Sequence, residues 1–345
     1  MKHRHTPEQK TARSLSIVSG LLFWIFSFTY LAFNQAGMMR VATEQFVSPN
    51  IHYNQWIGAV VITAVLWLLG CFGYYLYHFS GKFVALAYLP SYLLLGALTS
   101  FNAEIFAGVL PVNTFLWVGG VVVLFYLMGW IKRKLCFIDT KQPFVNGFVS
   151  NLIITILLGI ATVSIGNTNE DLYHEINILC ALKDGDNERA LLLGKKSVEA
   201  GKEVTALRAV ALHRIGKMGE NLFEYPQTYG AEGLKSSFFH ETESDYELAA
   251  LLLNKDLKGF YSRLSTLPQT DSLPKHYVEA MILYKHLHPE FSFSVNNDEL
   301  NKKFQDYLAY QKELRQSDEV KKYPMAEKNR MRREYRDTYW YYYMY

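Results

Sequence analysis

Few side chains in this 345-residue chain could do chemistry, and the best placed of them is Glu104. It follows Asn102 and precedes Ile105 and Phe106, so its carboxylate stands in an apolar stretch. An ionisable group at membrane depth is a functional candidate, here for handling a proton or a substrate. Because no basic residue accompanies Glu104, it belongs to no catalytic constellation. We therefore interpret Glu104 and Asn102 as polar residues of a solvated loop and keep the proton-handling role as the alternative.

Three histidines, His276, His286 and His288, lie close enough in the sequence to raise the question of a metal site. Two ligands on one helix face stand three or four residues apart, and these histidines are ten and two residues apart. We predict that they are surface histidines and that the chain holds no metal. We also expect no cofactor, because the sequence contains no phosphate-binding glycine loop, nucleophile elbow or zinc signature.

The C-terminal segment has an unusual composition. Residues 321–345 hold seven basic and three acidic residues and end in an aromatic run that includes Tyr339, Trp340 and Tyr341. We interpret the segment as folding back onto its own domain. Two alternatives stay open: the aromatic residues could lie at the membrane–water interface, where Trp and Tyr are favoured, or they could bind a partner protein.

Five apolar stretches in the first half reach the roughly 18–20 residues that cross ~30 Å of hydrocarbon. They lie at about residues 15–34, 56–79, 83–101, 112–131 and 148–165, which predicts a transmembrane domain over residues 1–166. Within them, Pro90 is tolerable in a membrane helix, and Gly119 and Gly120 predict close helix packing. Asn34, Gln35 and Asn151 either lie near the ends of spans or form hydrogen bonds between helices, which would be a packing role.

The basic residues of this half predict an orientation. If the five spans alternate, nine basic residues lie on one side of the membrane and only Arg40 lies on the other. The nine are Lys2, Arg4, Lys10, Arg13, Lys82, Lys132, Arg133, Lys134 and Lys141. Positively charged loops stay in the cytoplasm. The N-terminus is therefore predicted to be cytoplasmic, and the C-terminal half is predicted to lie outside the cytoplasm.

This topology has two chemical consequences. Cys71, Cys136 and Cys180 fall in three different environments, so no disulfide is expected among them. Nucleic acid is not expected as a partner, because the basic C-terminal segment lies on the far side of the membrane from the cytoplasm.

The second half has helical periodicity and no sustained two-residue alternation, so we predict an all-α domain over residues 167–320. The run that begins at Gly185 and Asp186 is echoed 31 to 32 residues later by the run that begins at Gly216. Paired helices at a period of roughly 34 residues are typical of tetratricopeptide repeats. The usual aromatic positions are mostly absent, so an ordinary helical bundle remains the alternative.

Several sequence runs resemble one family. They are residues 1–13 (MKHRHTPEQKTAR), 223–226 (FEYP), 273–280 (LPKHYVEA) and 338–342 (TYWYY). Together they resemble an uncharacterised family of multi-spanning inner-membrane proteins from Bacteroidota. The resemblance implies the inner membrane of a Gram-negative cell, and with the orientation predicted from the basic residues the C-terminal domain would then lie in the periplasm. It implies no activity and assigns no site residue.

The functional expectation that follows is a non-enzymatic one. A helical-repeat domain offers an extended surface for protein contacts, so we expect a membrane-anchored scaffold or interaction module that contacts membrane lipid and an envelope protein. The alternative is a membrane enzyme or transport component that acts on a lipid-linked or envelope substrate, with Glu104 at its site. Oligomeric state does not follow from the sequence.

Overall fold

The computed structural model is all-helical over the residues that it describes. The described residues are 7–48, 53–79, 81–101, 103–108, 112–135, 144–195, 200–239, 244–267, 273–290, 297–323 and 325–345. The chain divides into two compact units, residues 1–176 and 177–345. The prediction of an all-α chain is confirmed for the described residues.

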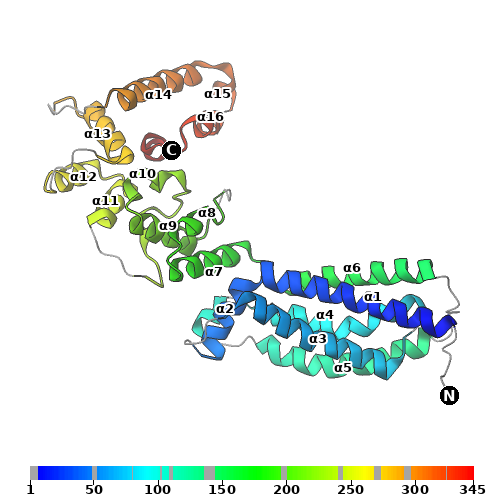
Figure 1. Ribbon diagram of the computed structural model, residues 1–345. Coiled ribbons are helices and arrows are strands. Elements are labelled where there is room, and N and C mark those ends of the chain that lie inside the picture. The colour runs from blue at the N-terminus through cyan, green and yellow to red at the C-terminus, as the bar shows by residue number, and fades with distance from the viewer. Residues whose placement is uncertain are drawn as a thin grey trace. The chain divides into compact units, whose positions relative to one another are not determined.

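The first unit is a bundle of long apolar helices (Figure 1). Its elements are α1 (Pro7–Thr29), the π-helix η1 (Tyr30–Asn34), α2 (Ala36–Phe46), α3 (Gln55–Tyr77), the 3₁₀-helix η2 (Gly81–Tyr88), α4 (Leu89–Leu98), the 3₁₀-helix η3 (Ala103–Ala107), α5 (Val112–Leu135) and α6 (Phe144–Ile165). Among the described residues, four stretches are long and apolar enough to cross a membrane: Arg13–Asn34, Gln55–Tyr77, Gly81–Leu98 and Val145–Ile165. The fifth predicted span, residues 112–131, lies in the 24-residue helix α5.

The third span differs from a simple helix in a way that the sequence analysis did not predict. It begins as the 3₁₀-helix η2 and becomes the α-helix α4 just before Pro90, which stands in the first turn of α4. That position suits proline, because the first-turn N–H groups have no partner within a helix. A 3₁₀-helix rises ~2.0 Å per residue against ~1.5 Å for an α-helix. The 18 residues therefore extend about 31 Å instead of about 27 Å, close to the ~30 Å of a bilayer core.

Polar side chains join the helices inside this unit. The amide oxygen of Asn151 on α6 accepts from Ala85 N–H at 2.7 Å, and its amide nitrogen donates to the carbonyl oxygens of Gly81 at 2.9 Å and Gly147 at 2.7 Å. The hydroxyls of Ser27 and Thr63 are 3.0 Å apart between α1 and α3. The prediction that Asn151 bonds between helices is confirmed. In apolar surroundings these bonds satisfy groups that have no water to bond to.

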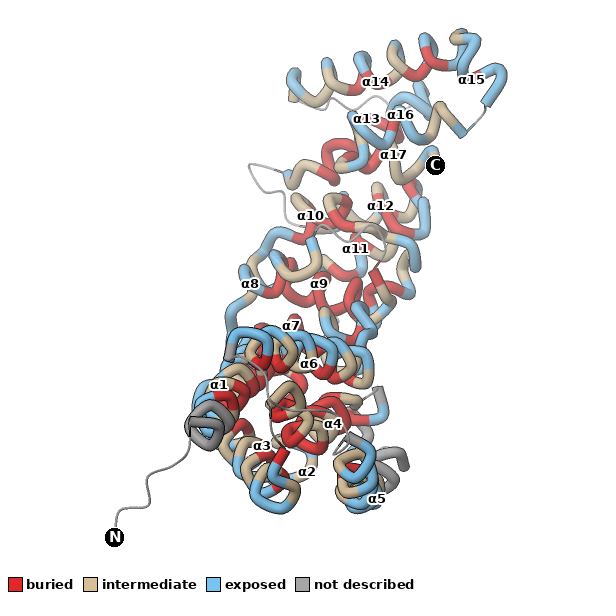
Figure 2. The backbone as a smooth tube through the Cα atoms, turned by 90° about the vertical axis from the view of Figure 1, so that its right-hand side faces the viewer, coloured by how far each residue is buried: buried red, intermediate tan, exposed pale blue. Residues whose placement is uncertain are grey.

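The outward faces of the same helices are exposed (Figure 2), and they carry large apolar side chains such as Val65, Phe72 and Ile160. In the most apolar 18-residue stretch of α6 only 22% is buried, and in the corresponding stretch of α3 only 28% is buried. A helix that is hydrophobic on its exposed face needs an apolar medium around it. One packing prediction is wrong: no atom lies within 4 Å of a side chain built at Gly119 or Gly120, and Gly119 is exposed, so these glycines do not mark close helix packing.

The second unit consists of shorter helices. They are α7 (Glu170–Lys183), in which the boundary between the units falls, α8 (Asn187–Leu192), α9 (Lys202–Arg214), α10 (Met218–Asn221), the 3₁₀-helices η4 (Leu222–Glu224) and η5 (Gly230–Leu234), α11 (Ser244–Leu253), α12 (Leu257–Leu264), α13 (Lys275–Leu287), α14 (Asp298–Gln316), α15 (Asp318–Lys322), α16 (Met325–Tyr335) and α17 (Tyr339–Met344). α9 is central to this unit, because all nine residues from Val204 to Leu212 are buried. Its small residues, such as Ala206 and Ala209, let neighbouring helices approach closely.

One helix–turn–helix connection occurs three times in this unit. α7, α9 and α11 each end in a residue with left-handed backbone, and these residues are Gly185 (φ 77°), Gly216 (φ 66°) and Lys255 (φ 59°). The next N–H then bonds back five residues, from Asp186 to Ala181, from Lys217 to Leu212 and from Asp256 to Leu251, at 2.8–2.9 Å. This is the Schellman end of a helix. The likeness of the first two turns is visible in the sequence, and the turn at Lys255 is a third of the same kind among the described residues.

Candidate functional site at the C-terminal helix

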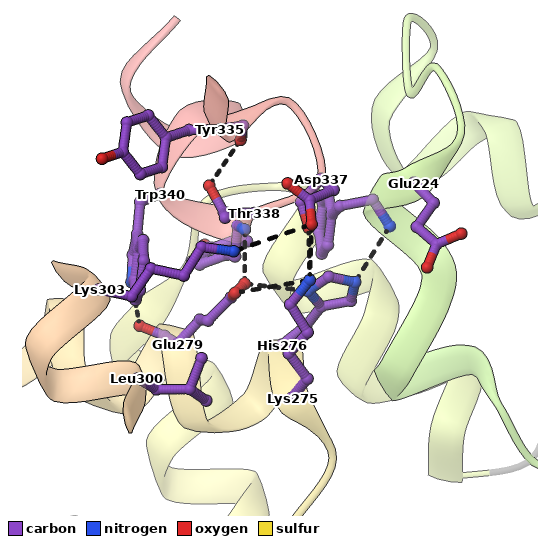
Figure 3. A network of polar contacts seen from close by, with 12 residues as sticks. Glu224, Lys275, His276, Glu279, Leu300, Lys303, Tyr335, Asp337, Thr338 and Trp340 are labelled. Carbon is purple, nitrogen blue, oxygen red and sulfur yellow. Dashed lines mark hydrogen bonds and ion pairs between the residues drawn. The ribbon is translucent and has the colours of Figure 1, made fainter. Parts of the chain in front are cut away.

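A buried polar network in the second unit joins α13 to α17 (Figure 3). Pro274 precedes α13 and fixes the backbone at its start. Eight residues of α13 are buried, and they include His276 and Glu279, each with 0% exposure. Buried charges are rare unless they are paired, so these two residues define the candidate site.

His276 uses both of its ring nitrogens. Its Nδ1 lies 3.0 Å from Oε2 of Glu279, one helical turn further along. Its Nε2 accepts the N–H of Phe223 from η4 at 3.4 Å. Because Nε2 is the acceptor, Nδ1 carries the proton and donates it to the carboxylate. The ring therefore connects α13 to η4 and fixes the orientation of Glu279.

Glu279 caps the C-terminal helix. Its Oε2 also accepts the N–H of Tyr339, the first residue of α17, at 2.8 Å. A carboxylate at this position pairs with a helix N-terminal N–H and with the positive end of the helix dipole. Thr338 adds the ordinary side-chain cap, because its hydroxyl accepts the N–H of Tyr341 at 3.3 Å. The other carboxylate oxygen of Glu279, Oε1, has no hydrogen-bond partner among the described residues, and Nζ of Lys275 lies 4.0 Å from it.

Trp340 completes the attachment of α17. Its indole N–H donates to the backbone carbonyl of Glu279 at 2.8 Å, and its ring packs against Phe304 and Tyr307 of α14, with centroids 5.0 Å and 5.9 Å away. The side chain is fully buried. Tyr339 is also fully buried, and its hydroxyl donates to the carbonyl of Leu252 on α11 at 3.2 Å.

A charged rim closes the network at the surface. Nζ of Lys275 donates to the carboxylate of Asp337 at 3.0 Å and to its backbone carbonyl at 3.1 Å, and Lys303 lies 3.9 Å from the same carboxylate. Partial burial by itself raises the pKa of Asp337, but the hydrogen bond and the charge of Lys275, with the charge of Lys303, hold that pKa below its usual value. Asp337 is therefore ionised around neutral pH.

The turn at Lys255 contacts the same helix from the other side. Its ammonium group lies 5.5 Å from the ring centre of Tyr342 and 5.9 Å from that of Tyr343. Burial, followed by the nearby charge of Lys328, lowers the pKa of Lys255. The hydroxyl of Tyr342 donates to the carbonyl of Leu253 at 2.7 Å. One of the three repeated turns is therefore part of the surface that holds α17.

This geometry makes the network a structural latch and gives it no reactive face. His276 and Glu279 have no exposed surface, and every nitrogen of the imidazole is occupied. No group of three His, Cys, Asp or Glu side chains suitable for a metal occurs among the described residues. We use "latch" below for His276, Glu279, Thr338, Tyr339 and Trp340.

The residues singled out from the sequence fall in separate places. Glu104 lies on η3 with an exposed side chain, and Asn102 lies outside the described residues. Tyr339 and Trp340 lie inside the latch, and Tyr341 is half-buried beside it. The structure thus brings the three aromatic residues together on α17 and places Glu104 in the other unit.

The prediction that His276 lies at the surface is wrong, because this side chain is fully buried. His286 and His288 are exposed, as predicted. The partner of His276 is Glu279, an acid three residues later on the same helix face. This spacing of histidine and glutamate is the sequence signal that could have predicted the buried pair. The buried Arg208, which donates to the carbonyls of Leu193 at 3.1 Å and Gly194 at 2.7 Å, had no such signal.

Fold and site together define a class: an all-helical protein with membrane-length apolar helices in one unit and a latched C-terminal helix in the other. Residues 240–345 match a family of unknown function, DUF6057. The matched segment contains α11 to α17 and therefore every residue of the latch. No curated protein and no solved structure matches the chain.

Proposed function

We propose that this chain is a five-span inner-membrane protein of the Bacteroidota type, whose tetratricopeptide-like second unit lies in the periplasm and binds an envelope protein. The observation that carries the proposal is the contrast between the two units. Helices of the first expose apolar side chains along membrane-length segments, and those of the second bury their apolar residues inside short paired helices.

Exposed side chains support the membrane part. Large apolar residues such as Val65 and Phe72 on α3 and Ile160 on α6 are 52–60% exposed, on two helical segments that have few charges. Continuous exposure of this kind is unfavourable in water and favourable in hydrocarbon. Helix α5 also spans about 36 Å at ~1.5 Å per residue, enough to act as the fifth span.

The ends of the helices support the orientation. In Figure 1 the start of α1, the start of η2 and the end of α5 lie at one end of the first unit, and α2 lies at the other. The first group carries Arg13, Lys82 and the basic run 132–134, and α2 carries Arg40, which is paired with Glu44 at 3.1 Å. This is the charge distribution of a protein whose basic end faces the cytoplasm.

The repeated turns support the interaction module. Three helix pairs joined by the same Schellman turn resemble the helix pairs from which solenoid repeats are built. The second unit also exposes large apolar side chains at Leu192 (70%), Tyr323 (58%) and Met325 (67%). Single exposed residues need no explanation, but these positions are suitable places from which to look for a partner.

Reporter fusions test the topology. An alkaline phosphatase fused after Gly166 should be active and a green fluorescent protein fused there should be dark. The matched control is a pair of fusions after Lys134, where the reporters should behave in the opposite way. The same reporter active at both sites, or the reverse pattern, contradicts the proposed orientation.

Photo-crosslinking in cells tests the interaction. A photoreactive amino acid at Leu192, Tyr323 or Met325 should capture one defined protein, and the same residue at Lys235, an exposed lysine, serves as the control for random encounters. Capture of lipid alone or of a second copy alone would count against a scaffold for another protein.

A further inference from the structure

A groove of about 580 Å³ opens on the side of the first unit between α1 and α3. Its walls include Ile17, Leu21 and Trp24 of α1 and Trp67 and Tyr74 of α3. The volume falls within the roughly 300–1,000 Å³ that is typical of small-molecule sites. Most of the wall is hydrocarbon or aromatic, so the groove suits an apolar ligand.

The side chains at the floor of the groove pack closely against Gly20, which leaves no room there for a side chain of its own. A Cβ built there would lie 2.7 Å from the hydroxyl oxygen of Tyr88 and 3.0 Å from Nε1 of Trp67. The thiol of Cys71 lies 3.8 Å from the same hydroxyl. Three weakly polar groups therefore meet in an otherwise apolar groove, and Gly20 allows two of them, the Tyr88 hydroxyl and the Trp67 indole, to approach the backbone of α1.

Arg13 stands at the mouth of the groove. Its side chain is exposed, and it has no ion-pair partner among the residues that the structure describes. It is also the first residue of the membrane-length stretch Arg13–Asn34. An arginine at that depth extends its guanidinium to the headgroup region and leaves its stem in hydrocarbon.

The length of the groove matches one leaflet. Arg13 and Trp24 are eleven residues apart on α1, which is about 16 Å at ~1.5 Å per residue. Half of a bilayer core of ~30 Å is about 15 Å. A chain that begins beside Arg13 can therefore run along the groove to Trp24 and end near the bilayer midplane.

We propose that the groove binds one acyl chain of an anionic phospholipid whose phosphate pairs with Arg13. The guanidinium supplies a fork of donors that matches phosphate oxygens, and the apolar groove below it selects a lipid over a free anion. The inference rests on the membrane placement of the first unit in the proposed function and adds a specific ligand to it.

Fluorescence quenching tests the site in full-length protein in mixed micelles, because two of the six tryptophans, Trp24 and Trp67, line the groove. Phosphatidylglycerol with brominated chains should quench part of the emission saturably, and at a lower mole fraction than brominated phosphatidylcholine. Arg13→Gln should raise the half-saturating mole fraction of phosphatidylglycerol by about five- to tenfold. The double variant Trp24→Phe, Trp67→Phe should lose the saturable part.

Arg133→Gln is the matched control, because Arg133 is an exposed arginine in the last turn of α5 and does not line the groove. It should leave the titration unchanged. A second variant, Ser16→Phe, fills the mouth of the groove without changing charge and should reduce the phosphatidylglycerol retained in native mass spectrometry.

Four results would overturn the proposal: equal quenching by both lipids, an equal effect of Arg13→Gln and Arg133→Gln, no effect of Ser16→Phe, and competition by glycerol phosphate as strong as that by the lipid. A crosslink between two copies through Ile17→Cys would assign the groove to a second chain and would overturn it as well. If the fusions after Gly166 and Lys134 behave as expected while the lipid test fails, only the lipid site falls.

Discussion

The latch predicts that Glu279→Ala and Glu279→Gln differ sharply, although both remove the same charge. In alanine the N–H of Tyr339 and the Nδ1–H of His276 lose their shared acceptor. Each unsatisfied buried donor costs about 1–3 kcal/mol, and the lost side chain leaves a cavity. We expect Glu279→Ala to destabilise the attachment of α17 by about 3 kcal/mol or more.

Glutamine can keep both hydrogen bonds. They end on the same oxygen, Oε2, so the amide oxygen can take its place. The amide nitrogen then replaces Oε1, which has no hydrogen-bond partner among the described residues and faces Lys275 at 4.0 Å. Glu279→Gln loses the electrostatic attraction of the carboxylate to Lys275 and to the dipole of α17. It also removes the desolvation cost of a buried charge, which offsets part of that loss. We expect Glu279→Gln to cost about 1 kcal/mol or less.

Hydrogen exchange measured by mass spectrometry on the full-length protein in detergent can resolve this difference, because it reports the local opening of α17. Exchange should rise more than about a hundredfold in Glu279→Ala and by less than about tenfold in Glu279→Gln, at ~1.4 kcal/mol per factor of ten. Glu290→Ala is the matched control, since Glu290 makes the same contact with His288 at 3.1 Å on an exposed surface. Equal acceleration in both Glu279 variants would refute the hydrogen-bond reasoning and assign the latch to charge.

The remaining predictions concern four single positions. Gly216→Ala should destabilise the turn between α9 and α10 by about 1 kcal/mol, as measured by hydrogen exchange. The cost is backbone strain alone, because φ is 66° there and a Cβ meets nothing within 4 Å. Lys255→Gly should change the stability of its turn by less than that, since it relieves the same backbone strain but loses the contacts with Tyr342 and Tyr343. The lowered pKa of Asp337 means that its stabilising contribution is present above its unfolded pKa of about 3.8 and is lost as pH falls through the lower folded pKa. The protection factors of α17, in which the pH dependence of intrinsic exchange is divided out, should therefore fall from pH 5 to pH 2, and they should fall less steeply in Asp337→Asn than in the unchanged chain. Glu104→Gln should leave crosslinking from Leu192 unchanged, and a loss of crosslinking would favour the role of Glu104 as a functional carboxylate.

Long apolar helices could be predicted from the sequence because membrane length and composition are local properties. The starts and ends of α3 and α6 lie within a few residues of the predicted spans. The 3₁₀ winding of η2 was not predicted, and the backbone contacts that accompany it at Gly81 and Ala85 come from Asn151, a residue far along the chain. The short helix α2 was also missed, since its stretch was counted only as an outer loop between two spans.

Turn chemistry was predictable where glycine marked it. Gly185 and Gly216 both end helices in left-handed backbone, and their similarity was visible in the sequence. The third turn uses Lys255, a residue that rarely adopts that conformation. A local sequence pattern could not have indicated this turn, because the contacts of Lys255 are with the rings of Tyr342 and Tyr343, almost ninety residues away in the chain.

The C-terminal aromatic run shows how the same residues change meaning once their partners are known. As a sequence, Tyr339 and Trp340 suit a membrane interface or a partner as well as a core. In the structure both rings are fully buried, and the backbone of α17 is capped by an acid from α13. Residues that hold a helix in place cannot also offer their rings to a ligand unless the helix detaches. The segment that matches DUF6057 contains the latch residues of α13 and those of α17. The attachment of α17 to α13 is therefore the first structural property of that segment to measure, and the comparison of Glu279→Ala with Glu279→Gln measures it.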